Sequence, residues 1–308
     1  LTLQVTSQHV IRGDEVCVAV NTEADGVVAD GKLTFAYDSK SLKFVGAEAG
    51  EAWPAGTELS LKVNSGKKDA VVAAFAGAKA AKAGTVLTLK FEALQECRTQ
   101  VVLQGGYISG AKDAKLQSTA TLLVECPASR FTDVDRNEYY HEGIDFVVSR
   151  GYMIGMGGAK FQPDTEMSRA MLVTVLWRMA GSPAAQGNGG FTDLKAGWYR
   201  QAAVWGAQNG IVAGTGAGTF SPDTPVTKEQ AAALLVRFAR MRGISIPADT
   251  APVYVAECSA WAQADVQAAY AASILDRFPA CLAAPQEAAT RAELARMLRL
   301  LSNLLQKA

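Results

Sequence analysis

Three positively charged side chains stand where helices are expected to begin. Each follows a Ser or Thr suited to cap a helix N-terminus, and the pairs are Ser168 with Arg169, Thr227 with Lys228, and Thr290 with Arg291. Because the first turn of a helix carries partial positive charge, a cation there costs up to about 1 kcal/mol unless a negative group lies nearby. That group is either an internal carboxylate or the carboxylate or phosphate of a ligand, which helix N–H groups and the cation would bind together.

The segments around these cations repeat at intervals of about 60 residues. They read FQPDTEMSRA from Phe161, FSPDTPVTKEQA from Phe220 and PQEAATRAE from Pro285. Upstream of them stand FTDV from Phe131, FTDL from Phe191 and YVAE from Tyr254. An aromatic residue then opens a helix in each repeat, namely Tyr139, Trp198 and Trp261. These signals predict a unit of helix, loop and helix that occurs three times.

The helical periodicity sets the expected boundaries of these units. First helices are predicted over 140–150 and 198–209, ending at Gly151 and Gly210, where a left-handed C-cap is natural. Second helices are predicted over 169–180, 228–242 and 291–305, and capping-box spacing occurs at Thr227 and Thr290. Since one such unit buries its apolar stripe poorly alone, we expect the three to pack into one all-α domain over 130–308, with units at about 130–184, 190–246 and 252–308.

This pattern of aromatic, Asp, Trp, glycine loop, Phe-x-Pro and Thr-Arg-Ala-Glu resembles the S-layer homology family. The resemblance implies a pseudo-threefold prism of three units that binds secondary cell-wall polysaccharide, often through a pyruvate ketal. Carboxylate recognition then falls to Arg169, Lys228 and Arg291, with Asp133 and Asp193 positioning the cations or binding sugar hydroxyls. Tyr139, Trp198 and Trp261 are either core residues or a wall of the site, and Gly155 and Gly214 would let the backbone approach a sugar.

The third unit departs from the pattern. It carries Ala256 in place of the Asp, Ser273 in place of Gly210 and Ala283 in place of Phe220. We therefore expect the pocket of Arg291 to be lost and that unit mainly to complete the fold, so that alanine at Arg169 or Lys228 would weaken binding more than alanine at Arg291. Cys258 and Cys281 occur only in this unit, and a disulfide between them is a candidate.

The first 126 residues follow a different period. Short runs of period two or of β-branched residues predict nine strands, at 2–6, 15–21, 31–37, 43–47, 58–63, 70–75, 86–93, 100–103 and 119–124. Nine short strands separated by turn residues favour a β-sandwich. His9 is the sole histidine of this half, and no catalytic grouping surrounds it.

The segments IRGDEVCVAVN, LTFAYDSKSLKFVGAEAG and VVAAFAGAK followed by GTVLTLKFEAL resemble the cohesin family. Cohesins are jelly-roll sandwiches, and the resemblance implies that one sheet face binds a dockerin module. Asp30, Lys32 and Tyr37 would contribute to that face. The pair Asp30 and Lys32 departs from the more usual neutral and acidic pair, so the partner class is expected to differ or the face to bind something else.

Composition limits the remaining choices. The chain has 308 residues, 49% of them hydrophobic, and 30 basic side chains against 30 acidic ones, so it lacks the basic excess of a nucleic-acid binder. It shows no apolar run of membrane-spanning length, and no signal peptide precedes the first strand, which we interpret as a mature or trimmed chain and not as evidence for the cytoplasm. No nucleophile, acid pair, metal set or cofactor motif is recognised, so an enzyme is not expected.

The two resemblances together predict a non-catalytic anchoring protein of the bacterial cell surface. Residues 130–308 would bind wall polysaccharide, and residues 1–126 would display a protein-binding face, with dockerin-bearing proteins as partners. The alternative is a structural S-layer or envelope-tether protein in which the sandwich is a lattice or spacer module. Self-assembly into sheets without capture of a dockerin would favour the alternative.

Overall fold

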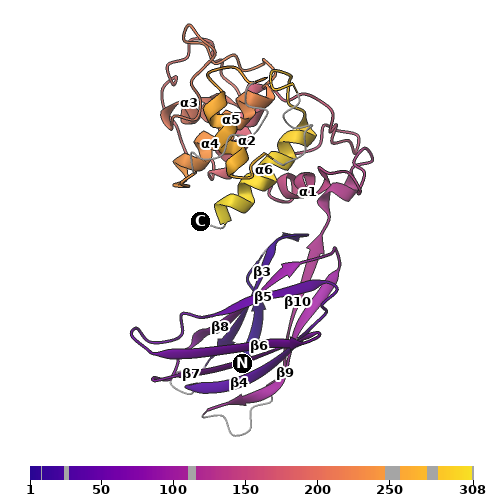
Figure 1. Cartoon of the computed structure of the whole chain (residues 1–308), viewed down its shortest axis with the longest axis vertical. Helices are drawn as coiled ribbons and strands as arrows, with labels where there is room; N and C mark the ends of the chain where they lie inside the picture. Colours follow the sequence, from indigo (N-terminus) through magenta and orange to yellow (C-terminus); the bar gives the residue numbers. More distant parts are fainter. Residues whose placement is uncertain (8, 24–27, 110–115, 247–256, 276–283, 307–308) are drawn as a thin grey trace. The chain divides into compact units, whose positions relative to one another are not determined.

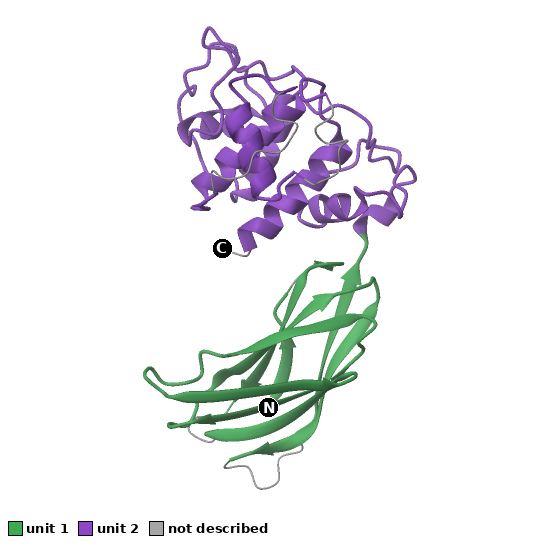
Figure 2. Ribbon diagram, in the orientation of Figure 1, with its two compact units in different colours: residues 1–126 green, residues 127–308 purple. Residues whose placement is uncertain are grey.

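The computed structural model of the chain describes residues 1–7, 9–23, 28–109, 116–246, 257–275 and 284–306. Two compact units divide the chain, Leu1–Cys126 and Pro127–Ala308 (Figure 2). Strands build the first unit and helices the second, as Figure 1 shows. In the described part of the chain, no helix combines the length and the apolar character that crossing a membrane requires.

The first unit is a sandwich of two β-sheets. Its strands are β1 (Thr2–Val5), β2 (Val10–Ile11), β3 (Glu15–Thr22), β4 (Asp30–Tyr37), β5 (Leu42–Ala49), β6 (Leu59–Lys67), β7 (Ala70–Gly77), β8 (Gly84–Ala93), β9 (Arg98–Ile108) and β10 (Ser118–Glu125). One sheet has the order β1-β3-β8-β5 and the other the order β2-β10-β9-β4-β7-β6. The pairing is antiparallel throughout except that β2 runs parallel to β10.

The alternation of side chains along each strand fills the space between the sheets. In β4, Leu33 and Phe35 are fully buried, and they face residues of β8 such as Leu89 and Phe91, which are also fully buried. All nine strands predicted from period two are present. The structure adds β2, whose two residues are too few for any periodicity to reveal.

Within the residues that the structure describes, the second unit contains a short 3₁₀ helix, η1 (Pro127–Arg130), and six α-helices. These are α1 (His141–Ser149), α2 (Arg169–Met179), α3 (Arg200–Gln208), α4 (Lys228–Met241), α5 (Gln263–Ala271) and α6 (Arg291–Gln306). The five predicted helix ranges are confirmed to within two residues at each end, and α5 follows the aromatic residue Trp261, as expected. The odd-numbered helices open a repeat, and the even-numbered ones follow its loop.

The predicted capping chemistry is also present. The side chain of Ser168 accepts a hydrogen bond from the N–H of Met171 and has no capping box, whereas Thr227 forms a full box with Gln230. Gly151 and Gly210 follow the first helices with φ of 67° and 68°. Ser273 occupies the corresponding place after α5 and adopts the same left-handed conformation, with φ of 56°. The third repeat therefore keeps the backbone geometry after losing the glycine.

Replacing Ser273 with glycine is expected to raise the free energy of unfolding by about 0.5–1 kcal/mol, because glycine adopts positive φ without steric cost. Gly210→Ala is the matched control and should lower it by a similar amount. Urea unfolding of the full chain followed by circular dichroism measures both. A Ser273→Gly variant that is less stable than the parent would contradict this account of the turn.

Main-chain hydrogen bonds join the three repeats into a closed ring. The first N–H groups of the second helices donate to the loop of another repeat: Arg169 N to Thr224 O, Lys228 N to Glu287 O, and Arg291 N to Thr165 O, each at 2.9 or 3.0 Å. The first helices pack in the same rotation, since α3 contacts α2, α5 contacts α4, and α1 contacts α6. Each repeat therefore completes its neighbour, and the last completes the first.

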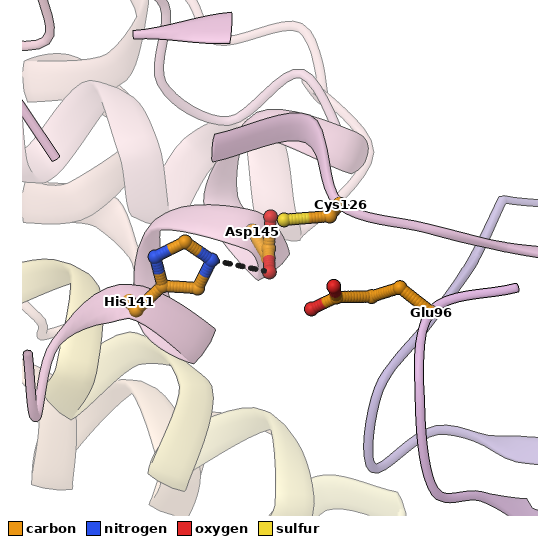
Figure 3. Close-up of side chains that lie close together, drawn as sticks. All are labelled: Glu96, Cys126, His141 and Asp145. Atoms are coloured by element: carbon orange, nitrogen blue, oxygen red, sulfur yellow. Dashed lines mark ion pairs between the residues drawn. The ribbon is translucent and has the colours of Figure 1, made fainter. Parts of the chain in front are cut away.

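A buried ion pair fixes the start of this unit. On α1, His141 Nε2 lies 3.4 Å from Asp145 Oδ2, and both side chains are nearly inaccessible to solvent. Figure 3 shows the imidazole directed at that carboxylate; the other two side chains drawn belong to residues 1–126. Asp145 Oδ1 also accepts the N–H of Ala128 in η1 at 2.7 Å. The pair is thus occupied in holding η1 against α1.

Candidate functional site

Two of the three predicted cations are buried against an aromatic residue of another repeat. Arg169 Nε donates to the Phe220 carbonyl at 2.9 Å, and its guanidinium carbon lies 5.3 Å from the centre of the Phe220 ring. Arg291 makes the same bond to the Phe161 carbonyl at 2.9 Å, with its guanidinium carbon 4.3 Å from that ring. Both side chains are at least nine-tenths buried, so their charges are held in one place.

A carboxylate on the other side of each phenylalanine fixes the same loop. Asp193 accepts the N–H groups of Phe220 and Ser221 at 2.8 and 2.7 Å. Asp133 accepts those of Phe161 and Gln162, both at 2.9 Å. The prediction that these aspartates position the cations therefore has a concrete geometry, in which Asp and Arg bind opposite faces of one peptide segment.

These groups shift one another's titration. Burial lowers the pKa of Arg291 to about 10, which the charge of Asp133 partly offsets, and burial lowers the pKa of Arg169 as well. Both guanidinium groups stay cationic at neutral pH. For the aspartates, burial favours the neutral acid, but the backbone hydrogen bonds outweigh it and lower the pKa of Asp133 and of Asp193.

Arg291 lines a cavity of about 220 Å³, which we name groove 1. It is formed by the loop and second helix of the first repeat, with one residue from each of the other two repeats. Its main lining residues are Ile154, Gly155, Met156, Met171, Trp198 and Arg291. Arg291 Nη2 also donates to the Ile154 carbonyl at 2.7 Å, which turns the guanidinium toward the glycine loop.

Arg169 lines a second cavity of about 330 Å³, which we name groove 2. Its main lining residues are Gly214, Thr215, Gln230, Arg237, Trp261 and Arg169. The two grooves correspond position by position: a glycine loop, the first turns of a second helix, a tryptophan from the following repeat and an arginine from the preceding one. The match shows that the ring builds the same kind of site twice.

Because each second helix begins against the loop of another repeat, the predicted pocket of Arg291 has to be corrected. We expected Arg291 to share the fate of its own eroded repeat, but its side chain lies in groove 1, whose loop belongs to the intact first repeat. The error arose because residues adjacent in sequence were assumed to share a pocket. In a ring, the start of each second helix faces the loop of another repeat.

Lys228 is placed differently from the two arginines. Its Nζ lies 3.4 Å from Glu293 Oε1 and 3.5 Å from Glu287 Oε2, both in the third repeat. Of the two negative groups considered for these cations, Lys228 therefore binds an internal carboxylate. It contacts the third repeat and does not line groove 2. Two of the substitutions on which that repeat's loss of function was predicted, Ala256 and Ala283, lie outside the described residues.

The three predicted aromatics lie at the surface. Trp198 and Trp261 are 61% and 53% exposed, and Tyr139 is 37% exposed, which excludes a core role for all three. Within the described part of the chain, the indole N–H groups of Trp198 and Trp261 make no hydrogen bond. Each tryptophan therefore offers a ring face and a donor beside a buried cation.

The loop glycines line the two grooves, and packing also constrains them. A Cβ on Gly155 would come within 2.6 Å of the Phe131 ring, and one on Gly214 within 2.6 Å of the Thr219 carbonyl. Gly214 also has φ of 79°. Both glycines are required by packing inside their own repeat, independently of any ligand.

The three residues predicted for the protein-binding face divide between two sides of β4. Lys32 points outward and is exposed, Asp30 shares that side of the strand, and the two are separated by the buried Gly31. Tyr37 follows Leu33 and Phe35 on the inner side, where its ring lies 5.1 Å from that of Phe91. Tyr37 is therefore half-buried and packs against the core, on the other side of β4 from Asp30 and Lys32.

The candidate disulfide is not placed, because Cys281 lies outside the described residues; Cys258 is buried at 6% exposure. Sequence reasoning missed Met171 and Gln230, which line the grooves from the third position of α2 and α4. It also missed Arg237, which lines groove 2 and pairs with Asp265 at 3.0 Å. Capping-box spacing marked that third position, but only as a feature of helix stability.

Comparison with family models separates the two units. Residues 1–123 match the cohesin domain. Residues 130–170 and 190–232 match the S-layer homology domain, which covers the first two repeats. The match does not extend to the third repeat, where the sequence pattern is weakest.

Relatives match the chain in part. It is 29% identical over 139 residues to a surface-layer 125 kDa protein of Lysinibacillus sphaericus, covering 44% of this chain and 12% of that protein. It is 25% identical over 130 residues to an S-layer protein of Bacillus thuringiensis subsp. finitimus, covering 42% and 16%. The chain thus spans less than a fifth of the length of these relatives.

Among solved structures, a non-cellulosomal cohesin from the archaeon Archaeoglobus fulgidus is 17% identical. It covers 46% of this chain and 96% of its own, with a TM-score of 0.32.

Proposed function

We propose that the chain is a non-catalytic anchoring protein of the bacterial cell surface, in which residues 127–308 bind an acidic wall polysaccharide. The observation that carries the proposal is the repeated constellation of grooves 1 and 2. Each combines a buried guanidinium with an exposed tryptophan. A cation suits a sugar carboxylate, and an indole face suits the apolar face of a sugar ring.

The guanidinium donors support this reading. Arg169 uses Nε on the Phe220 carbonyl and Nη1 on Gln230 Oε1, at 2.9 and 3.4 Å, and within the described residues its Nη2 makes no hydrogen bond. Arg291 similarly uses Nε and Nη2 and leaves Nη1 without a partner there. Arginine carries five N–H donors, so each side chain can be held by the protein and still bind a carboxylate. A pyruvate ketal on a hexose presents such a carboxylate.

We extend the S-layer homology assignment to the third repeat and describe residues 127–308 as a pseudo-threefold, all-α trimer of such units. The ring of equivalent main-chain bonds and the shared geometry at Gly151, Gly210 and Ser273 support the extension. In this arrangement the third repeat contributes Arg291 to groove 1 and Trp261 to groove 2. It is therefore needed for binding even if no ligand occupies a groove of its own.

Binding to isolated cell walls tests the proposal. The full chain should sediment with walls of an S-layer-bearing bacterium, and chemical removal of the secondary polysaccharide should abolish this. Removal of the ketal alone by mild acid should weaken it if pyruvate is the recognised group. Undiminished binding to stripped peptidoglycan would contradict the polysaccharide proposal.

For residues 1–126 we propose display of a protein-binding face, with a dockerin module as the partner. The match to the cohesin domain supports this, and the outward side of β4 carrying Asp30 and Lys32 is the proposed contact. Capture of dockerin-bearing proteins that Lys32→Glu abolishes would support it. Assembly of the chain into sheets, with no dockerin captured, would instead favour a lattice or spacer role.

A further inference from the structure

The three second helices differ at their third residue, and that residue faces the cation of another repeat. In groove 2 it is Gln230, whose Oε1 accepts from Arg169 Nη1 at 3.4 Å. At the start of α6 it is Glu293, whose Oε1 lies 3.4 Å from Lys228 Nζ. In groove 1 it is Met171, which lines the cavity with Arg291. The third helical residue is thus an apolar thioether in α2, a neutral amide in α4 and a carboxylate in α6.

From this gradation we infer that the third helical residue sets the anion affinity of each groove. The inference rests on the proposed function, since the anion is the sugar carboxylate proposed above. A carboxylate at this position neutralises the facing cation and repels a second carboxylate, an amide occupies one donor without adding charge, and a thioether does neither. Groove 1 is then the strongest anion site, groove 2 follows, and Lys228 is held by the protein's own acid.

Most neighbouring groups are arranged alike in the two grooves. Asp133 and Asp193 are equivalent, and each binds its phenylalanine loop in the same way. Arg178 and Arg237 also stand at matching positions in grooves 1 and 2. Arg237 pairs with Asp265, which also pairs with Arg240, whereas Arg178 Nη1 donates to the Tyr152 carbonyl. The partners of these two arginines are thus the remaining difference, and substitutions at the third helical residue leave it unchanged.

Met171→Glu separates this effect from a change in folding. Ser168 already caps α2 through the N–H of residue 171, so a glutamate there completes a capping box of the kind seen at Thr227. The variant should be as stable as the parent or more so. Its carboxylate should nevertheless reach Arg291 and weaken carboxylate binding in groove 1. Met171→Gln, which caps equally well without charge, is the matched control.

Each groove has its own reporter. Trp198 lines groove 1 and Trp261 lines groove 2. The chain has three other tryptophans. The indoles of Trp53 and Trp177 donate hydrogen bonds to main-chain carbonyls, and Trp205 is buried. The indole N–H signals of the ¹⁵N-labelled full chain are assigned with Trp198→Phe and Trp261→Phe. The probe is the methyl glycoside of a hexose carrying a 4,6-pyruvate ketal.

In Met171→Glu we expect the Trp198 titration to weaken about tenfold and the Trp261 titration to stay unchanged. Gln230→Glu should produce the opposite pattern, and Met171→Gln should change the Trp198 titration less than threefold. Equal titrations in the parent and in both glutamate variants would overturn the inference while leaving the proposed function intact. If neither indole of the parent responds to the probe, the proposed sugar-carboxylate ligand is wrong and the inference falls with it.

Discussion

Replacing Arg291 with alanine is expected to weaken binding to wall polysaccharide by about 10- to 100-fold, the range for losing one or two hydrogen bonds to a charged group. The reason is positional. Arg291 belongs by sequence to the repeat with the poorest family pattern, but its guanidinium lies in groove 1. Arg169→Ala should also weaken binding, through groove 2, but to a smaller extent because groove 2 is the weaker anion site. Sedimentation with walls, measured over a range of chain concentrations, gives the apparent affinities.

Lys228→Ala is the internal comparison, and its effect should stay within about threefold because Glu293 and Glu287 already hold that cation. Arg291→Lys controls for loss of the buried side chain, since it keeps the charge without the planar fork. Thermal unfolding of every variant separates lost binding from lost structure. A stronger effect of Lys228→Ala than of Arg291→Ala would mean that each cation serves its own repeat, contrary to the ring.

Asp193→Ala is expected to lower the free energy of unfolding of the helical unit by about 2–4 kcal/mol. Two backbone N–H groups, those of Phe220 and Ser221, would lose a charged acceptor. Phe220 is fully buried, and its carbonyl holds Arg169, so groove 2 should lose affinity together with stability. Urea unfolding gives the first quantity, and the Trp261 indole titration gives the second.

The conservative variant Asp193→Asn should recover part of the stability, because one amide oxygen can still accept. Thr192→Ala, next to it and exposed, is the matched control: it loses only the hydroxyl bond to the Gly218 carbonyl at 3.3 Å and should lower the free energy of unfolding by about 1 kcal/mol or less. An Asp193→Ala variant as stable as the parent would show that the loop is held by other contacts.

The stabilising effect of the hydrogen bonds from backbone N–H groups to Asp133 and Asp193 should also appear in the pH dependence of stability, without any mutation. The pKa values of Asp133 and Asp193 lie below the ordinary value of 3.8, so both carboxylates favour the folded state in their charged form. Their contribution is complete above about pH 5 and is lost as the pH falls through the lowered pKa values. Thermal unfolding between pH 2 and 6 should show a drop at the acidic end that is shallower in Asp193→Asn.

Much of the fold could be predicted from local signals. Period two along β4 distinguishes Leu33 and Phe35 from Lys32, and capping residues such as Thr227 mark where the second helices begin. These signals succeed because they depend on neighbours within a few residues.

The grooves could not be predicted in this way. Arg291 and Phe161 are 130 residues apart, and nothing within either repeat indicates that they meet. From the sequence alone, Arg291 was expected beside the altered loop of its own repeat. In the ring, it lies beside the loop of the first repeat. The contact that forbids a side chain at Gly155 is made by Phe131, 24 positions earlier, and local sequence signals do not reveal it.

The closed ring also fixes when the helical unit can mature during synthesis. The bond from Arg291 N to the Thr165 carbonyl and the packing of α1 on α6 join its first repeat to its last. A ribosome-bound chain that lacks α6 therefore exposes the face of α1 and an unfinished groove 1. Long-range closure of this kind slows folding, so the emerging repeats depend on being kept apart from neighbouring chains until the last helix arrives.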